Sequence, residues 1–346
     1  MDQESKKHLI QDIKPRKKSH HVESFSIEDS LIVSVEVDSE NEISKADRIK
    51  ALLLMSISAF CFMLTISLCK YGYLINEKMN GMDYLLFRGT ILMFFATLET
   101  LYRKVNVFRV PREIYVSVIF RYLTGLVGMA LYFYAIKYLP MSQSNVILSI
   151  SPLITAILAY FLLSEILVGR DILCLIGAFG GAVVVNVSRI GEKGVSESEN
   201  NYLKGILLIM VSIIFRSTAP VAIRQMSKYV SSIYSPFYFA LGLFSHSVFL
   251  LTFCRSYLNY EYYNLKTIML FSGSAFSNYI AQSLMSIAYN YEKATVLAPF
   301  SYLVTCGLLL IDCLLFGYDF NIVYFLGFTM ILVCVLSPLL FKISKK

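Results

Sequence analysis

Long apolar runs constrain the fold of this chain more than any other feature. Ten runs of predominantly apolar residues follow one another between residues 49 and 341. A helix needs about 20 such residues to cross a bilayer, and backbone polar groups in hydrocarbon must be satisfied internally. The sequence therefore predicts an all-α polytopic membrane protein with ten transmembrane helices. The predicted spans are 49–69, 83–102, 113–136, 142–163, 171–188, 203–223, 234–254, 267–288, 294–316 and 322–341.

Composition and charge agree with a membrane protein. The 346 residues are 56% hydrophobic and 16% charged, whereas a soluble domain usually carries about 25% charged residues. The net charge of +7 comes from Lys and Arg in the tails and loops, which is typical of membrane topology and not of nucleic-acid binding. No P-loop, nucleophile elbow or metal-ligand cluster occurs in the sequence. The sequence predicts no enzyme, no cofactor and no metal site.

The distribution of basic residues predicts the orientation. Loops on the N-terminal side of the membrane are richer in Lys and Arg, and the clearest signal is the loop with Arg103, Lys104, Arg109 and Arg112. Because positive loops stay in the cytosol, both termini are expected there, in either the plasma membrane or an endomembrane. Residues 1–47 are polar without periodicity and are predicted to form a disordered cytosolic tail.

Matching polar positions in two spans predict an internal repeat. Each position in span four has a counterpart 153 residues later in span nine, and both sets follow helical spacing. The positions are Ser142, Asn145, Ser149 and Pro152, and Thr295, Ala298, Tyr302 and Thr305. Five spans per half is an odd number, so the second half would have opposite polarity, an architecture of secondary carriers. The sequence thus predicts two inverted five-helix repeats, 49–188 and 203–341, a linker at 189–202 and a cytosolic C-terminus at 342–346.

Several motifs resemble a known family. They are Phe87-Arg88-Gly89, Arg121-x3-Gly125-x2-Gly128-x3-Tyr132-x2-Ala135, the segment from Ser142 to Pro152 with Glu165 after it, Ala298-Pro-Phe-Ser-Tyr302 and Leu314-Leu-Phe-Gly317. Their order resembles the drug/metabolite transporter superfamily, EamA type, and in particular the G subfamily of solute carrier family 35. The resemblance covers about 49–341. It implies two EamA-like repeats and a carrier whose substrate varies within the family.

Charged residues within the spans are the first candidates for function. An intramembrane charge costs about 2.5–3.5 kcal/mol on insertion scales, so Arg121 and Arg216 need a reason to be there. Guanidinium groups bind carboxylate or phosphate through paired hydrogen bonds, which favours an anionic substrate. The alternative is that either arginine pairs with Glu99 or Asp312 and ties helices together. Arg88 lies nearer the outer surface, where its side chain could extend to the interface, and a structural role is favoured for it.

Other polar residues complete the predicted site. His246 could relay protons, although a neutral histidine bonded to a neighbouring helix is the simpler interpretation. Span eight carries polar residues at helical spacing, which favours a solute pathway over helix contacts. The GxxxG of Gly177 and Gly181 indicates helix packing and a possible homodimer. The predicted substrate-binding residues are Arg121, Asn145, Ser149, Arg216, His246, Tyr279, Gln282, Ser301 and Tyr302.

The leading hypothesis is a secondary transporter of a small organic, anionic solute that works by alternating access between the repeats. Its expected partners are that small-molecule solute and the lipid bilayer, without nucleic acid. Two alternatives stay open. One is a nucleotide-sugar transporter, and the other is a membrane scaffold or regulator that transports nothing and acts through its cytosolic tail.

Overall fold

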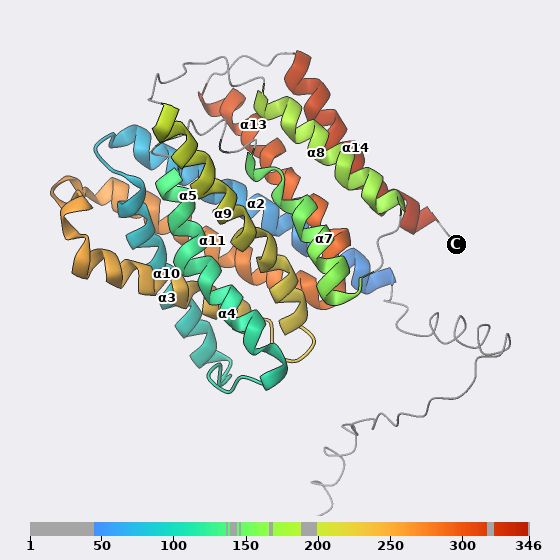
Figure 1. Ribbon diagram of the computed structural model, residues 1–346, viewed down its shortest axis with the longest axis horizontal. Helices are drawn as coiled ribbons and strands as arrows, with labels where there is room; N and C mark the ends of the chain where they lie inside the picture. Colours follow the sequence, from blue (N-terminus) through green and yellow to red (C-terminus); the bar gives the residue numbers. More distant parts are fainter. Residues whose placement is uncertain are drawn as a thin grey trace, which may run out of the picture. The chain divides into compact units, whose positions relative to one another are not determined.

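The computed structural model describes residues 45–135, 138, 144, 147–165, 169–187, 199–316 and 322–344 (Figure 1). Contacts along the chain separate 1–42 from Ile43–Lys346, so all described residues belong to one unit. Several predicted parts lie outside the described residues: the tail up to residue 44, residues 188–198 with most of the linker, the C-terminal residues 345–346 and the site residue Asn145. Over the described part the chain is helical, without strands, which confirms the all-α prediction.

Each of the ten predicted spans coincides with helix in the described residues. In chain order the elements are α2 (Lys45–Ile75), α3 (Gly81–Tyr102), α4 (Tyr115–Leu123), η2 (Thr124–Gly128), α5 (Met129–Ala135), α7 (Ser151–Leu163), α8 (Gly169–Val187), α9 (Glu199–Met226), α10 (Tyr234–Phe253), α11 (Leu265–Tyr291), α12 (Ala294–Leu297), η5 (Ala298–Ser301), α13 (Tyr302–Phe316) and α14 (Ile322–Ser344). Short 3-10 turns lie at Arg112–Ile114, Arg255–Tyr257 and Tyr260–Tyr262.

The helices present apolar side chains outward. Within the described part, five helical segments are long and apolar enough to cross a membrane, and four more are apolar but shorter. In α9, Leu203, Leu207 and Ile214 share one side and are more than half exposed, while Ile209 and Ile213 on the opposite side are buried. An exposed apolar face of this kind suits lipid rather than water. The outer surface is therefore that of an integral membrane protein.

Helix packing relates the first five spans to the last five. The first span of the first half, α2, packs on the third span of the second half, α11. The first span of the second half, α9, packs in the same way on the third span of the first half, which comprises α4, η2 and α5. Likewise α7 contacts α9 as α13 contacts α2. In the same manner α3 contacts α11 as α10 contacts α4 and η2. Spans in equivalent positions also pack on each other: α3 on α10, and α8 on α14, which run side by side in Figure 1. Two related halves would give this exchange of partners, and their inverted polarity remains a prediction.

Three of the predicted spans are not continuous α-helices. Span three contains the π-helical turn η2, span nine contains the 3-10 turn η5, and span four has a turn at Ser149 and Ile150 before α7 begins. Pro152 and Pro299 lie in the first turn of α7 and η5, where a missing N–H costs least. The polar positions of span nine therefore do not follow one regular α-helix. In span four, Ser142 and Asn145 lie outside the described residues, so the predicted helical face there stays a prediction.

Close backbone contacts explain two glycines of the predicted GxxxG region. A Cβ on Gly181 would lie 2.8 Å from the carbonyl oxygen of Gly327 in α14, and a Cβ on Gly177 would lie 2.5 Å from the sulfur of Cys334. Small residues allow helix backbones to approach closely in membranes. The GxxxG thus packs α8 on α14 within one chain, and a homodimer remains a prediction.

Candidate functional site

The interrupted spans four and nine meet at their breaks. The Tyr302 hydroxyl at the start of α13 donates to the backbone carbonyl of Ser149, 2.7 Å away, and the two residues are 153 positions apart. Tyr302 and Ser149 are both buried, and Ser301 donates within its own turn to the Ala298 carbonyl. The structure thus brings together two predicted site residues in equivalent positions of the two halves. Asn145, predicted beside them, lies outside the described residues.

Arg121 is held by neutral partners on two other helices. Its Nε donates to the Ser235 hydroxyl at 2.9 Å, and its Nη2 donates to the Gln282 side-chain oxygen. The guanidinium also lies 4.5 Å from the ring centroid of Phe239. Arg121 therefore ties α4 to α10 and α11, as the structural alternative supposed, although Glu99 is not its partner. The side chain of Asp312 lies outside the described residues.

Glu99 is bound elsewhere. It forms an ion pair with Arg103 at 2.9 Å and accepts a hydrogen bond from the Tyr279 hydroxyl. Tyr279 also stacks on Phe95 with ring centroids 6.0 Å apart. The predicted site residue Tyr279 thus joins α11 to α3, one helical turn before Gln282.

His246 is buried in α10 without a bond to its Nε2 atom. No hydrogen-bond acceptor or donor among the described residues reaches this atom, and the imidazole ring lies 6.4 Å from that of Phe249. The structure does not place His246 in contact with any other predicted site residue in the described part of the chain.

Arg216 faces inward in α9 and is nevertheless exposed. Ile209, Ile213 and Ile223 follow the same side of the helix at helical spacing and are buried, whereas Ile214 on the lipid side is 56% exposed. Arg216 itself is classed with the exposed residues. A side chain can be exposed on an otherwise buried side only if a solvent-reachable space opens there. Arg216 is therefore reached by solvent on the side of α9 that faces the neighbouring helices.

Arg88 and Tyr132 are functional candidates that the sequence interpretation missed. Arg88 is only 8% exposed, so its side chain is covered by other residues and does not reach out of the helix bundle, whereas the structural role favoured for it stays a prediction. Its guanidinium carbon lies 5.8 Å from the ring centroid of Tyr84. Electrostatic interactions join Arg216 to Arg88 and to Tyr132. The available signal was that Arg88 lies within a predicted span, as Arg121 and Arg216 do.

Ion pairs of two buried glutamates gather at one end of the bundle, which we name the ion-paired end. Glu165, just after α7, accepts hydrogen bonds from the backbone N–H groups of Ala294 and the next residue, both at 3.1 Å. It also pairs with Arg224 at the end of α9 at 3.5 Å. Arg48 in α2 pairs with Glu292, which follows α11, at 2.5 Å. These contacts join four spans and the start of α12.

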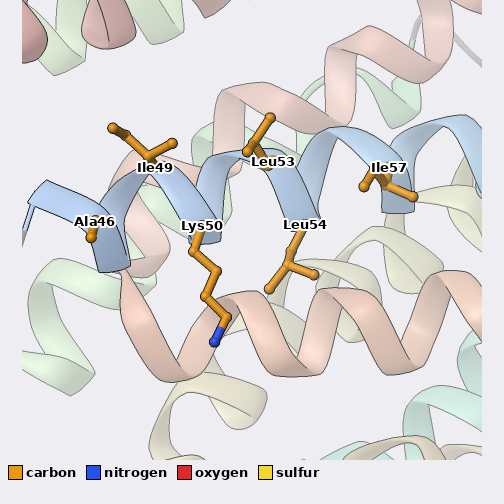
Figure 2. A pocket seen from close by; sticks show the side chains of 6 residues that line it. All are labelled: Ala46, Ile49, Lys50, Leu53, Leu54 and Ile57. Carbon is orange, nitrogen blue, oxygen red and sulfur yellow. The ribbon is translucent and has the colours of Figure 1, made fainter.

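A surface hollow along the start of α2 is not the site. Figure 2 shows its lining, which is apolar except for Lys50: Ala46, Ile49, Lys50, Leu53, Leu54 and Ile57. Lys50 reaches toward the neighbouring helix, where it donates to the Tyr291 hydroxyl at 2.9 Å. Leu53 is 59% exposed, as expected of a lipid-facing side chain. The hollow offers no set of polar groups for a solute.

Comparison with known proteins agrees with the architecture. Residues 49–187 match the model of the EamA-like transporter family. The human protein "Solute carrier family 35 member G1" is 26% identical over 195 residues, which cover 54% of this chain and 53% of the human protein. The match thus spans about half the length of that relative. A protein solved by crystallography has the same fold, with a TM-score of 0.70 and 17% identity over 86% of this chain and 99% of that one. The resemblance found in the sequence motifs is confirmed.

Proposed function

Residues 49–187 belong to the EamA-like transporter family, and from this premise we propose that the protein is a secondary carrier of a small organic anion. The contact between Ser149 and Tyr302 is the observation that carries the proposal. In carriers built from inverted repeats, interrupted helices form the substrate site near the membrane midplane, between the halves. Spans four and nine are interrupted and meet at their breaks, so the solute pathway is proposed to run beside them.

The position of Arg216 supports the proposal that the solute is negatively charged. It lies within a membrane-spanning helix, opens on an inward space and has no carboxylate partner in the described part of the chain. Guanidinium groups bind carboxylates and phosphates by paired hydrogen bonds. Ser149, Ser301, Tyr302, Tyr279 and His246 are proposed to line the same pathway, with Gln282 oriented by Arg121.

The ion-paired end is proposed to face the cytosol. The positive-inside rule places both termini there, and the ends of α7, α9 and α11 with the start of α2 lie on the same side as the N-terminus. The described conformation would then be closed toward the cytosol by the pairs of Glu165 with Arg224 and of Arg48 with Glu292. Alternating access would require these pairs to separate.

Uptake into liposomes tests the proposal. Purified protein is reconstituted, and uptake of labelled carboxylates, phosphate esters, nucleotide sugars and neutral sugars is compared with that of empty liposomes. The proposal expects saturable uptake of one or more small anions. Preferred uptake of a nucleotide sugar would favour that narrower class. Absence of uptake across the panel, together with absence of any ligand-induced stabilisation, would leave the scaffold alternative.

A further inference from the structure

Aromatic rings connect two arginines of different helices. The guanidinium carbon of Arg88 in α3 lies 5.8 Å from the ring centroid of Tyr84, and the Phe133 ring lies 5.8 Å from Tyr84 and 5.3 Å from Tyr132 of α5. Tyr132 in turn packs on Ile209 and Ile213, which share the Arg216 side of α9. In agreement with this arrangement, Arg88, Arg216 and Tyr132 interact electrostatically with one another. Among the described residues, the other groups that interact with them are Tyr84 and Cys69, and neither is a carboxylate. The protein therefore leaves the positive charge of this pair uncompensated in the described structure.

Arg88 has an unused donor in this group. Its side chain is more than nine-tenths buried, and its Nε atom finds no hydrogen-bond partner among the described residues. A buried donor without an acceptor is rare in folded proteins and calls for an explanation such as a functional role. The Nε atom of Arg224 at the ion-paired end also lacks a hydrogen bond, but it lies 3.5 Å from the Glu165 carboxylate, and Arg48 pairs with Glu292. Arg88 differs from both because it has no carboxylate partner among the described residues. Arg88 and Arg216 thus retain the capacity to bind an external anion.

We propose that Arg88, Arg216 and Tyr132 form the binding site of a small dianion, either a dicarboxylate or a phosphate monoester. Two guanidinium groups supply two positive charges and paired N–H donors, and the tyrosine hydroxyl supplies one further donor. Arg216 is exposed on the inner side of α9, which gives the solute access to the group. The assignment of this dianion as the transported substrate rests on the proposed carrier function.

The position of the group fits a site between the two halves. Arg88 and Tyr132 come from the first five spans, and Arg216 comes from the second five. Carriers built from repeats bind their substrates at the interface of the repeats. A ligand that bridges α3, α5 and α9 would neutralise the two arginines and link the halves at the same time.

Charge selectivity tests the site. Uptake of succinate, a dicarboxylate, and of glycerol 3-phosphate, a phosphate monoester, is compared with uptake of lactate, a monoanion. The variants Arg88→Gln and Arg216→Gln should each lower dianion uptake at limiting concentration by about tenfold or more, because each loses hydrogen bonds to a charged group. Lactate uptake should be retained or increased. The difference between the two dianions identifies which chemistry the site prefers.

Arg255→Gln is the matched control, since Arg255 is exposed in the 3-10 turn that follows α10. It should behave as the unmodified protein does. If either inner variant loses lactate and dianion uptake equally, or loses neither, the site proposal is overturned. If the Gln variants do not fold, Arg88→Lys and Arg216→Lys keep the charge and should keep the preference for dianions with weaker affinity. Loss of that preference in a folded Lys variant would also overturn the proposal.

A binding measurement separates this proposal from the carrier function. Thermal unfolding of the purified protein is followed with and without succinate or glycerol 3-phosphate. A rise in Tm that is lost in Arg216→Gln, in a protein that transports nothing, would support the dianion site and contradict the carrier. Neither uptake nor a Tm shift with any of the dianions would overturn both. Uptake of neutral solutes alone would keep a carrier and overturn the site.

Discussion

Arginines inside the apolar helices of this protein are of two kinds. Arg121 is saturated by Ser235 and Gln282, and its role is to join helices. Arg88 keeps an unpaired Nε donor, and neither it nor Arg216 has a carboxylate partner in the described part of the chain, so both are proposed to bind the solute. The sequence shows all three charges, but it does not distinguish the kinds. The deciding contacts join residues more than 100 positions apart, so they depend on tertiary packing that no local pattern encodes.

Ser164 offers a test of local backbone strain. It ends α7 in the left-handed conformation, with φ of 53°, which costs a non-glycine residue roughly 1 kcal/mol. Ser164→Gly should therefore raise the free energy of unfolding by roughly 0.5–1 kcal/mol. Thermal unfolding in detergent measures the change. Ser67→Gly, within α2, is the control and should lower stability, because glycine destabilises a helix interior. A lower Tm for Ser164→Gly would contradict the strain argument.

Helix positions are the part of the fold that the sequence predicts best. Bounds of the predicted spans fall within several residues of the observed helices, because apolar runs of this length have few alternatives in a bilayer. The breaks in spans three, four and nine were not predicted. Polar periodicity assumes a regular helix, and only Pro152 and Pro299 indicate otherwise. In span nine the predicted helical face is therefore interrupted by η5, although the polar residues lie within the span as predicted.

Glu165 joins three elements, and its loss should weaken the ion-paired end. Its carboxylate receives two backbone N–H groups of α12 and pairs with Arg224. Glu165→Gln removes the charge from a buried site and should cost about 1.5–3 kcal/mol, as expected for hydrogen bonds to charged groups. The free energy of unfolding in denaturant measures this loss.

Arg103→Gln is the control for Glu165→Gln. Arg103 pairs with Glu99 but its side chain is 49% exposed, and exposed pairs contribute about 0–1 kcal/mol. A loss for Glu165→Gln no larger than that of Arg103→Gln would show that the buried glutamate does not hold this end together. If the ion-paired end closes the pathway, Glu165→Gln should also change the uptake rate, whereas Arg103→Gln should not.

The whole molecule carries a topological prediction. Ten spans place both termini on one side of the membrane, together with the loop that contains Arg103, Lys104, Arg109 and Arg112. Epitope tags at each end should react with antibody only after the plasma membrane has been permeabilised so that antibody reaches the cytosol. This holds whether the protein lies in the plasma membrane or in an endomembrane. A tag inserted between α10 and α11 should show the opposite accessibility. Termini on opposite sides would contradict the ten-span architecture.

The contact between Tyr302 and Ser149 has a consequence for energetics. It joins equivalent positions of the two halves, yet the bond is directional: the tyrosine hydroxyl donates and the serine carbonyl accepts. In a conformation in which each half adopts the arrangement of the other, the short side chain of Ser149 would have to reach the Tyr302 carbonyl across the same distance. The exchanged conformation would therefore lack an equivalent of this hydrogen bond. Two conformations related by such an exchange would differ in free energy. A carrier of this kind would have a preferred resting direction even with equal solute on both sides.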